Sequence, residues 1–540
     1  MVTGAFTGLN LSLRALYSSR RALNITSENV ANANTTGYTR RVADFRIFGE
    51  NAAGTSEPVF GLGADCVSAK RMRDNYLDTK IWNQSSISSG WSTKNDYYVE
   101  IEKILNESSI SDLSGVLNEF YSAWDQYANN PSNSTYGYLV QNRGLQLTTY
   151  FNETASQLEE LQVELNNDVK VKVDEINDLS ERLASLNSQI YNCEILGGDA
   201  STLRDERTLL VNRLSELGDV EYIEQDYGKL VNGNIERKVT IKFAGNPIVV
   251  HDQDYKLELH RRINKKNEED IEGLYDVTWA NGLKLNLNSG ELKSTIEIRD
   301  GKGEDQSDWV KGVPYYIKQL NDVARSFALG FNEGIVNGQR IGRGHAGGLT
   351  FNSVPSDTDD SDQDTTDDST QDATQGEGIR FFSIDKLSSA ELINVAVTDA
   401  DIINEYSYMT AKNISLSTEV LDDIKNLFKS YTDINNNNDT EGINSVLEFK
   451  DREDFFGAYN LEDCISGIIT TLGVDAEIAK NLYTSHDSIM TQYENQRDSY
   501  SSVNLDEEGT NLIRYQEMYN AAAKMMSVFS ELYETLVSII

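Results

Sequence analysis

The strongest constraint on the fold is a seven-residue repeat of apolar side chains late in the chain. One series advances in steps of seven: Leu505, Leu512, Tyr519, Met526, Tyr533 and Ile540. A second series lies three residues after the first: Tyr515, Ala522, Phe529 and Leu536. A paired repeat sustained over about five heptads is typical of one strand of a coiled coil. We therefore expect residues 476–540 to form a long helix whose last part pairs with another helix.

The first part of the chain supplies a matching repeat. Its apolar residues also follow one another in steps of seven: Leu9, Leu16, Leu23 and Val30. Residues 1–48 hold six arginines against two acids, whereas residues 501–540 hold six acids against two bases. Opposite charge favours the pairing of two helices. We therefore expect the two segments to pair as a coiled coil, with the middle of the chain folded as a projecting insertion, as in a subunit that assembles through its ends.

The middle of the chain predicts a mainly α-helical protein with β insertions (α+β). Leucines recur seven apart between Thr154 and Tyr191, which predicts a long helix and a long-helix bundle as the core. Apolar and polar residues alternate in 239–243 and 257–259, which predicts a small antiparallel β unit that projects from this core. Residues 355–378 hold eight aspartates and no large apolar side chain, and therefore predict a loop.

These patterns divide the chain into successive parts. We expect an N-terminal helix of the coiled-coil domain (1–50), a helical core with short extended pieces (51–217), a small antiparallel β domain (218–300), a return helix of the core (301–350), an acidic disordered loop (351–378), a mixed region (379–475) and a long C-terminal helix that completes both core and coiled coil (476–540).

The composition argues against two classes of partner. A net charge of −38 over 540 residues disfavours nucleic acid, whose phosphates require clustered Lys and Arg. No run approaches the roughly 20 apolar residues of a membrane helix, so we expect no membrane insertion. The first segment has no apolar run leading to a cleavage site. The protein therefore either stays in the cytoplasm or leaves by a route without a cleaved signal.

Patterns that resemble binding sites are few, and each has a simpler explanation. The string Gly342-x-Gly344-x-x-Gly347 follows a helix rather than a strand, so it predicts a flexible loop and no dinucleotide site. The acidic insert and the string starting at Asp433 lack the glycine and glutamate of an EF-hand calcium loop. The four histidines and three cysteines are not spaced as metal ligands. We therefore expect no enzyme activity, no cofactor and no metal.

Two strings carry a resemblance to a known family. The run from Asn24 to Arg40, NITSENVANANTTGYTR, resembles the N-terminal signature of bacterial flagellar axial proteins, which includes the equivalents of Asn32, Gly37 and Tyr38. The run from Val503 to Lys524 is similar to the C-terminal part of the same superfamily. The chain departs from the family at Val30, where isoleucine is more usual, and in its acidic insert.

The middle of the chain indicates which flagellar proteins it resembles most. Strings such as LRDER (203–207) and SGEL (289–292) look like those of the hook–filament junction family, the first hook-associated proteins. Membership implies a structural subunit between hook and filament, exported by the flagellar type III apparatus and located outside the cell. One alternative is a flagellar hook or distal-rod protein, against which the long helical core argues. The other is a cytoplasmic coiled-coil scaffold, which has no reason to carry both strings.

The resemblance also implies partners. These are other copies of the chain in a ring or helical assembly, the flagellar hook protein, the second junction protein (hook-associated protein 3) and a cytoplasmic export chaperone on the C-terminal helix. We expect the assembly interface at these residues: Leu9, Leu16, Leu23, Val30, Asn32, Gly37, Tyr38, Leu505, Leu512, Tyr515, Tyr519, Met526, Phe529, Tyr533 and Leu536. An amphipathic helix alone is marginal in water, so we expect both ends to be mobile in the monomer and to order on assembly.

Overall fold

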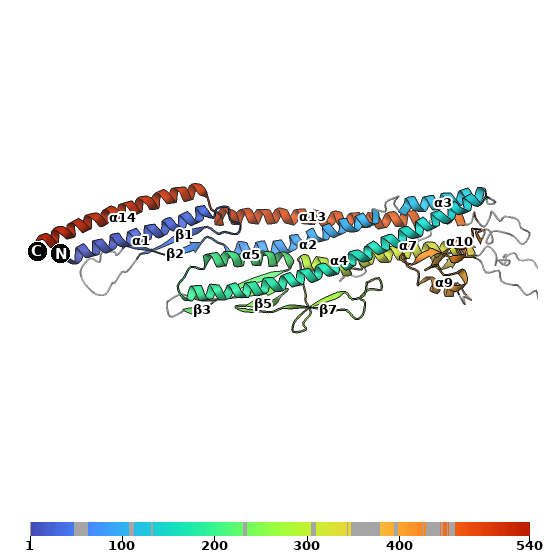
Figure 1. Cartoon of the computed structure of the whole chain (residues 1–540), viewed down its shortest axis with the longest axis horizontal. Coiled ribbons are helices and arrows are strands. Elements are labelled where there is room, and N and C mark those ends of the chain that lie inside the picture. Colours follow the sequence, from blue (N-terminus) through green and yellow to red (C-terminus); the bar gives the residue numbers. More distant parts are fainter. Residues whose placement is uncertain are drawn as a thin grey trace, which may run out of the picture.

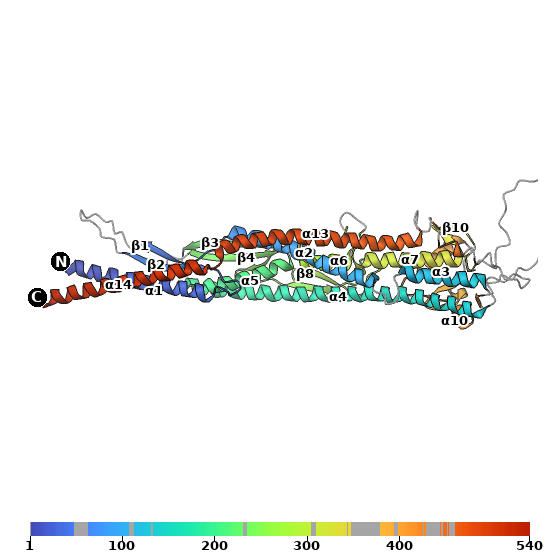
Figure 2. The same ribbon diagram turned by 90° about the horizontal axis from the view of Figure 1, so that it is seen from above.

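A computed structural model describes residues 2–47, 63–106, 113–130, 133–229, 235–303, 309–342, 344–346, 379–393, 398–424, 426–427, 443, 446–450, 452 and 460–539. The described chain forms a long rod (Figures 1 and 2). At one end, helices α1 (Val2–Ala31) and α14 (Leu505–Ile539) run antiparallel beside each other and extend beyond the other elements. We call this pair the terminal ribbon. The expectation that the two end helices pair is thereby confirmed.

The rest of the rod is a core bundle of long helices. Its main members are α2 (Asn75–Asn106), α3 (Leu113–Asn129), α4 (Ser134–Ile195), α5 (Ser201–Leu217), α7 (Val313–Glu333) and α13 (Leu461–Ser501). Helix α4 has 62 residues and therefore spans about 93 Å. It begins well before the predicted start at Thr154, because the Asn133 side chain caps it by accepting a hydrogen bond from the Thr135 amide at 3.0 Å.

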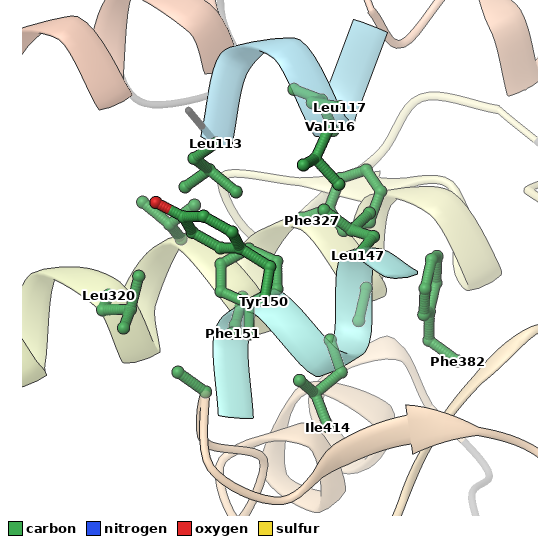
Figure 3. Close-up of a cluster of buried hydrophobic side chains, with 14 of the residues drawn as sticks. Leu113, Val116, Leu117, Leu147, Tyr150, Phe151, Leu320, Phe327, Phe382 and Ile414 are labelled. Carbon is green, nitrogen blue, oxygen red and sulfur yellow. The ribbon is translucent and has the colours of Figure 1, made fainter. Parts of the chain in front are cut away.

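The predicted apolar row of α4 is buried against the rest of the bundle. Leu158, Leu165 and Ile176 all have an exposed fraction of 0 %. Toward the far end of the rod, α3, α4 and α7 enclose a cluster of large side chains (Figure 3). Its centre is Phe120, whose ring lies 5.9 Å from that of Phe327 in an edge-to-face arrangement. This bundle therefore completes its hydrophobic core within one chain.

The β unit predicted for 218–300 is present and antiparallel. Strands β3 (Val220–Lys229), β4 (Ile235–Phe243), β5 (Asn246–Val250) and β6 (Gln253–Asp254) form one sheet in that order, and β7 (Leu257–Arg261) pairs with β8 (Tyr275–Trp279). The unit lies along α4, on the flank of the bundle (Figure 1). Asn177 of α4 fixes it there, because its side chain donates to the Leu257 carbonyl at 2.9 Å and accepts from the Leu257 amide at 2.8 Å. The end of the predicted β domain is instead helix α6 (Glu291–Asp300).

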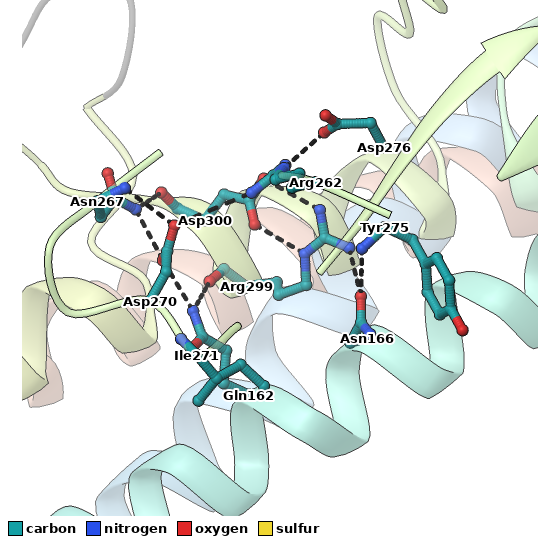
Figure 4. A network of polar contacts seen from close by, with 10 residues as sticks. All are labelled: Gln162, Asn166, Arg262, Asn267, Asp270, Ile271, Tyr275, Asp276, Arg299 and Asp300. Atoms are coloured by element: carbon teal, nitrogen blue, oxygen red, sulfur yellow. Dashed lines mark hydrogen bonds and ion pairs between the residues drawn. The ribbon is translucent and has the colours of Figure 1, made fainter. Parts of the chain in front are cut away.

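A buried polar network joins the β unit, α4 and α6 (Figure 4). Gln162 of α4 donates to the Asp270 carboxylate at 3.0 Å, and the Arg299 guanidinium donates to the Asn166 side chain at 3.0 Å. Burial alone would raise the pKa of Asp300, but the hydrogen bonds and charges of Arg299 and Arg262 outweigh burial and lower it. These paired charges attach the β unit to the bundle in one orientation.

Smaller elements complete the far end of the rod and the base of the ribbon. They are β1 (Arg41–Ile47), β2 (Ala64–Arg71), β9 (Ile335–Val336), β10 (Gln339–Arg340), β11 (Phe382–Ile384), α8 (Ser389–Leu392), α9 (Asp399–Tyr406), β12 (Ile414–Leu416) and α10 (Thr418–Asp422). Strands β1 and β2 form an antiparallel hairpin beside α1. The acidic loop predicted for 351–378 and the string at 433–437 lie outside the described residues.

The single helix predicted for 476–540 is wrong in one respect. The structure divides this region into α13, which already begins at Leu461, and α14, with a break at 502–504. Ser502 is extended, with φ −77° and ψ 159°, and the Asn504 side chain accepts from the Asp506 amide at 3.0 Å. Asn504 therefore starts a new helix. The break separates the part that completes the core from the part that forms the ribbon.

Candidate assembly site

The N-terminal signature folds into a buried polar hub where the terminal ribbon meets the core. Asn29, at the end of α1, has an exposed fraction of 0 %. Its side-chain amide donates to the Arg41 carbonyl at 2.8 Å and to the Glu508 carboxylate at 3.1 Å. Its oxygen accepts from the Arg41 amide at 3.0 Å and from the Tyr38 hydroxyl at 2.9 Å. One asparagine therefore ties together the end of α1, the start of β1 and the start of α14.

Two arginines extend the hub to α14 and to the core. Arg40 pairs with Glu507 and Glu508, at 2.8 Å in each case, and its amide donates to the Ser501 carbonyl at 2.9 Å. Arg41 is 4 % exposed and binds Glu28 of α1. It also donates to Thr202 of α5 at 2.9 Å. Buried charges of this kind are costly unless paired, so the hub specifies one arrangement of ribbon and core.

The turn between α1 and β1 depends on Gly37. Its φ is +77°, a backbone conformation that residues with a side chain rarely adopt. A Cβ added at this position would lie 2.6 Å from the Leu209 side chain of α5. Burial raises the pKa of the neighbouring Tyr38 to about 12, so its hydroxyl remains a hydrogen-bond donor at neutral pH. Asn32 is half-buried; its side chain donates to the Glu28 carbonyl at 2.9 Å and accepts from the Thr35 hydroxyl at 3.3 Å.

The seam of the ribbon begins at this hub and runs toward the ends of both helices. Asn29 meets Glu508, and Gly8 lies so close to Phe529 that an added Cβ would be 2.5 Å from the ring. The two contacts are 21 residues apart on both helices, which is three whole heptads. The seam therefore keeps one antiparallel register along its length.

On α14, the seam follows the two predicted apolar series in part. Tyr515 and Ala522 are buried, and the following are half-buried: Leu512, Tyr519, Met526 and Phe529. Leu505 and Tyr533, in contrast, are 56 % and 42 % exposed. The side chain of Leu536 lies outside the described part of the chain.

On α1, the predicted phase of the seam is wrong. The residues that turn toward α14 are small and also spaced in heptads: Gly8, Ser12, Ala15, Ser19, Ala22, Thr26 and Asn29. Leu9, Leu16 and Leu23 lie one position further round the helix and are only half-buried, and Val30 is 41 % exposed. Small residues occupy the seam because they let the two helices approach closely. The Ser12 hydroxyl, buried in the seam, donates a hydrogen bond to the Gly8 carbonyl at 2.9 Å.

The sequence prediction missed most of the hub. Asn29 belongs to the signature, Arg41 directly follows it and Asp205 belongs to the LRDER string, but no local pattern shows that Asp205 contacts Arg71 and Arg41. A search for a second heptad series would have found the small-residue seam on α1. Among the described residues, no group of three or more His, Cys, Asp or Glu side chains is placed to hold a metal ion. Within the same part of the chain, no helix is long and apolar enough to cross a membrane.

Comparison with known families and proteins identifies this architecture. Residues 98–351 match the family described as "Flagellar hook-associated protein FlgK helical domain". Residues 9–39 match "Flagella basal body rod protein", and residues 494–539 match "Flagellar basal body rod FlgEFG protein C-terminal". Flagellar hook-associated protein 1 of Bacillus subtilis (strain 168) is 27 % identical over 99 % of both chains. This similarity to flagellar hook-associated protein 1 extends over almost the whole chain, which makes the chain a structural protein of the hook–filament junction type.

A second full-length relative agrees with this assignment. Flagellar hook-associated protein 1 of Escherichia coli (strain K12) is 22 % identical over 98 % of this chain and 99 % of its own length. Among solved structures, the flagellar hook junction protein FlgK from Burkholderia pseudomallei aligns with a TM-score of 0.37 and 18 % identity, over 47 % of this chain and 43 % of that one. The predicted function, a structural protein of the flagellar hook–filament junction, is confirmed by the family.

Proposed function

We propose that this hook-associated protein assembles into the flagellum through its terminal ribbon. The interface consists of the predicted seam and signature residues together with the outer faces of α1 and α14. Its partners are further copies of the chain, the flagellar hook protein and the second junction protein, hook-associated protein 3. The site of action is the hook–filament junction outside the cell, reached by export. The core bundle and β unit hold the ribbon in a fixed orientation.

One observation carries this proposal: α14 keeps large apolar side chains exposed although it is already paired with α1. Met518, Val528 and Leu532 are 45 %, 54 % and 53 % exposed. Continuous exposed apolar surface of this kind marks a contact with another molecule. Before export, a cytoplasmic chaperone that covers α14 would protect the same surface. A catalytic role has no support, because the family is a structural one.

Complementation of a deletion strain tests this proposal. Cells without the gene should build hooks, lack filaments and release flagellin into the medium. The full chain should restore filaments, and a chain that ends at residue 503, before α14, should not. Immunolabelling should place the full chain between hook and filament. Normal filaments on cells that produce only the truncated chain would contradict assembly through the ribbon.

A further inference from the structure

The seam leaves a second apolar stripe uncovered on each helix of the ribbon. The α1 stripe consists of Leu9, Leu13, Leu16, Leu23 and Val30, of which the leucines are half-buried and Val30 is exposed. The α14 stripe consists of Met518, Met525, Val528 and Leu532, which are between 45 % and 54 % exposed. Successive members are three, four or seven residues apart, so each stripe follows one side of its helix.

The two stripes lie on opposite faces of the ribbon. On α1, Ser18 and Arg21 contact the β1–β2 hairpin, with Ser18 Oγ 3.2 Å from the Ala64 carbonyl and Arg21 Nη1 3.1 Å from the Cys66 carbonyl. Helical geometry places these two residues about 90° from the seam on one side and the α1 stripe about 100° from it on the other. The α1 stripe therefore faces away from the hairpin.

The α14 stripe lies on the hairpin side. Because α14 runs antiparallel to α1, helical geometry places Met518 and Met525 on the flank of the seam that corresponds to Ser18 and Arg21. The hairpin contacts α14 as well, since the ring centroids of Phe45 and Tyr515 are 6.0 Å apart. One ribbon thus presents the leucine-rich α1 stripe on one face and the methionine-containing α14 stripe on the other.

We infer that neighbouring copies of this chain join head to tail, with the α1 stripe of one copy against the α14 stripe of the next. This inference rests on the proposed assembly through the ribbon and specifies which surfaces meet. Each copy then has one donor face and one acceptor face, so the contact is heterologous and continues from copy to copy. A contact of this type builds a ring or an open helix rather than a closed pair.

Charge favours the packing of α1 of one copy on α14 of the next over the packing of α14 on α14. Helix α1 carries three arginines against Glu28, whereas α14 carries six acids against Arg514 and Lys524. The exposed Arg20 lies within the α1 stripe, and the exposed Glu517 and Glu531 border the α14 stripe. Packing α1 on α14 of the next copy therefore pairs opposite charges, but packing α14 on α14 would oppose acids. Methionines adapt readily to the shape of a facing leucine row.

Photo-cross-linking in assembled flagella tests which surfaces meet. A photoreactive amino acid replaces Leu16 in the full chain, two differently tagged versions are produced in one cell, and cross-linked peptides are identified by mass spectrometry. We expect position 16 of one copy to link to residues 518–532 of the other tagged copy. The same probe at Asn10, which is exposed on another side of α1, should give no link between copies.

The alternative results are distinct. Linkage of position 16 to α1 of another copy, to a different flagellar protein, or to no other chain would overturn the head-to-tail contact while leaving assembly through the ribbon intact. Absence of the unmodified full-length protein from the hook–filament junction would instead overturn the proposed function.

A charge exchange gives a second, independent test. Leu16→Glu and Met525→Lys should each reduce swimming about tenfold, because each places an unpaired charge in the contact. The double variant should recover most of the loss, because the new carboxylate of one copy then faces the new ammonium group of the next. Asn10→Glu and Ser538→Lys, exposed changes outside the stripes, should swim normally. A double variant no better than its worse parent would overturn the pairing, provided hydrogen exchange shows an intact seam in each chain.

Discussion

Along α4, Leu158, Leu165 and Ile176 are fully buried, whereas along α14, Met525 and Leu532 remain about half exposed. Both helices repeat apolar residues at heptad spacing, yet only the first finds enough partners within the chain. Helix α4 is surrounded by α3, α5, α6, α7 and the β unit, whereas the contacts of α14 within the described residues are mainly with α1, with the hairpin touching it through Phe45 and Tyr515. The same heptad pattern therefore produces a core that is buried within the chain along α4, and an apolar surface that remains exposed along α14.

The polar hub keeps these two regions connected. It joins α1 and α14 to α5 through buried ion pairs rather than through shared apolar packing. Ion pairs of this kind fix geometry and contribute little net stability. We therefore expect the ribbon to open and close largely independently of the core, and the following predictions test that separation in order of their effect on core stability.

The largest effect should come from the aromatic centre of the core. Trp124 is fully buried, and its ring lies 5.5 Å from those of Phe331 and Phe381. Trp124→Ala should lower the free energy of unfolding of the core by about 3–5 kcal/mol because it leaves a cavity. Thermal denaturation followed by circular dichroism measures this loss. Trp309→Ala removes a tryptophan that is 60 % exposed and should change the transition by less than about 1 kcal/mol.

Acid should weaken the core through His345. Burial lowers the pKa of this histidine to about 4, compared with about 6.5 in an unfolded chain. The folded state therefore disfavours the proton, so stability is complete above pH 6.5 and is lost progressively as the pH falls toward 4. The total loss is about 3 kcal/mol, and denaturant titrations at several pH values measure it. His345→Gln should flatten this slope, whereas His260→Gln, at an exposed site, should keep it.

A smaller and local effect is expected at the hub. Asn29→Ala removes four hydrogen bonds from the hub, among them those with the Tyr38 hydroxyl and Glu508. This should destabilise the ribbon by about 1–3 kcal/mol and leave core melting unchanged. Hydrogen exchange should accelerate in 8–31 and 505–535 but not in 154–190. Asn32→Ala is the matched control, because that side chain is only half-buried and makes two local bonds, to Glu28 and Thr35; acceleration of equal size there would contradict the role assigned to Asn29.

The sequence predicts the helices, the pairing of α1 with α14 and the β unit, because heptads and alternation are periodic patterns along the chain. It does not predict the phase of α1, since the Leu16 series and the Ser19 series both repeat every seven residues. Only the approach of α14 decides between them, through contacts such as that of Gly8 with Phe529. The hub escapes prediction for a related reason: Arg41 and Asp205 are far apart in the chain, and the fold alone brings them within 3.6 Å.

Phe529→Asp should affect the core hardly at all and assembly strongly. The Phe529 ring fills the space above Gly8 in the seam, and an aspartate there loses this packing and places a charge beside apolar groups. The seam should open near the ends of both helices, which hydrogen exchange of α1 and α14 measures. Core melting should shift by less than about 0.5 kcal/mol, because Phe529 lies three heptads further along α14 than Glu508, where the ribbon joins the core. Cells should lose filaments and release flagellin.

Ser530→Asp provides the matched control, because it adds the same charge to the next residue, which is exposed. It should leave hydrogen exchange and swimming close to those of the unmodified protein. Normal filaments on cells that carry Phe529→Asp would show that the seam is dispensable for assembly. A loss of core stability as large as that from Trp124→Ala would show instead that ribbon and core unfold as one cooperative unit. Either result would remove the physical basis for treating the ribbon as the part of this subunit that its neighbours complete.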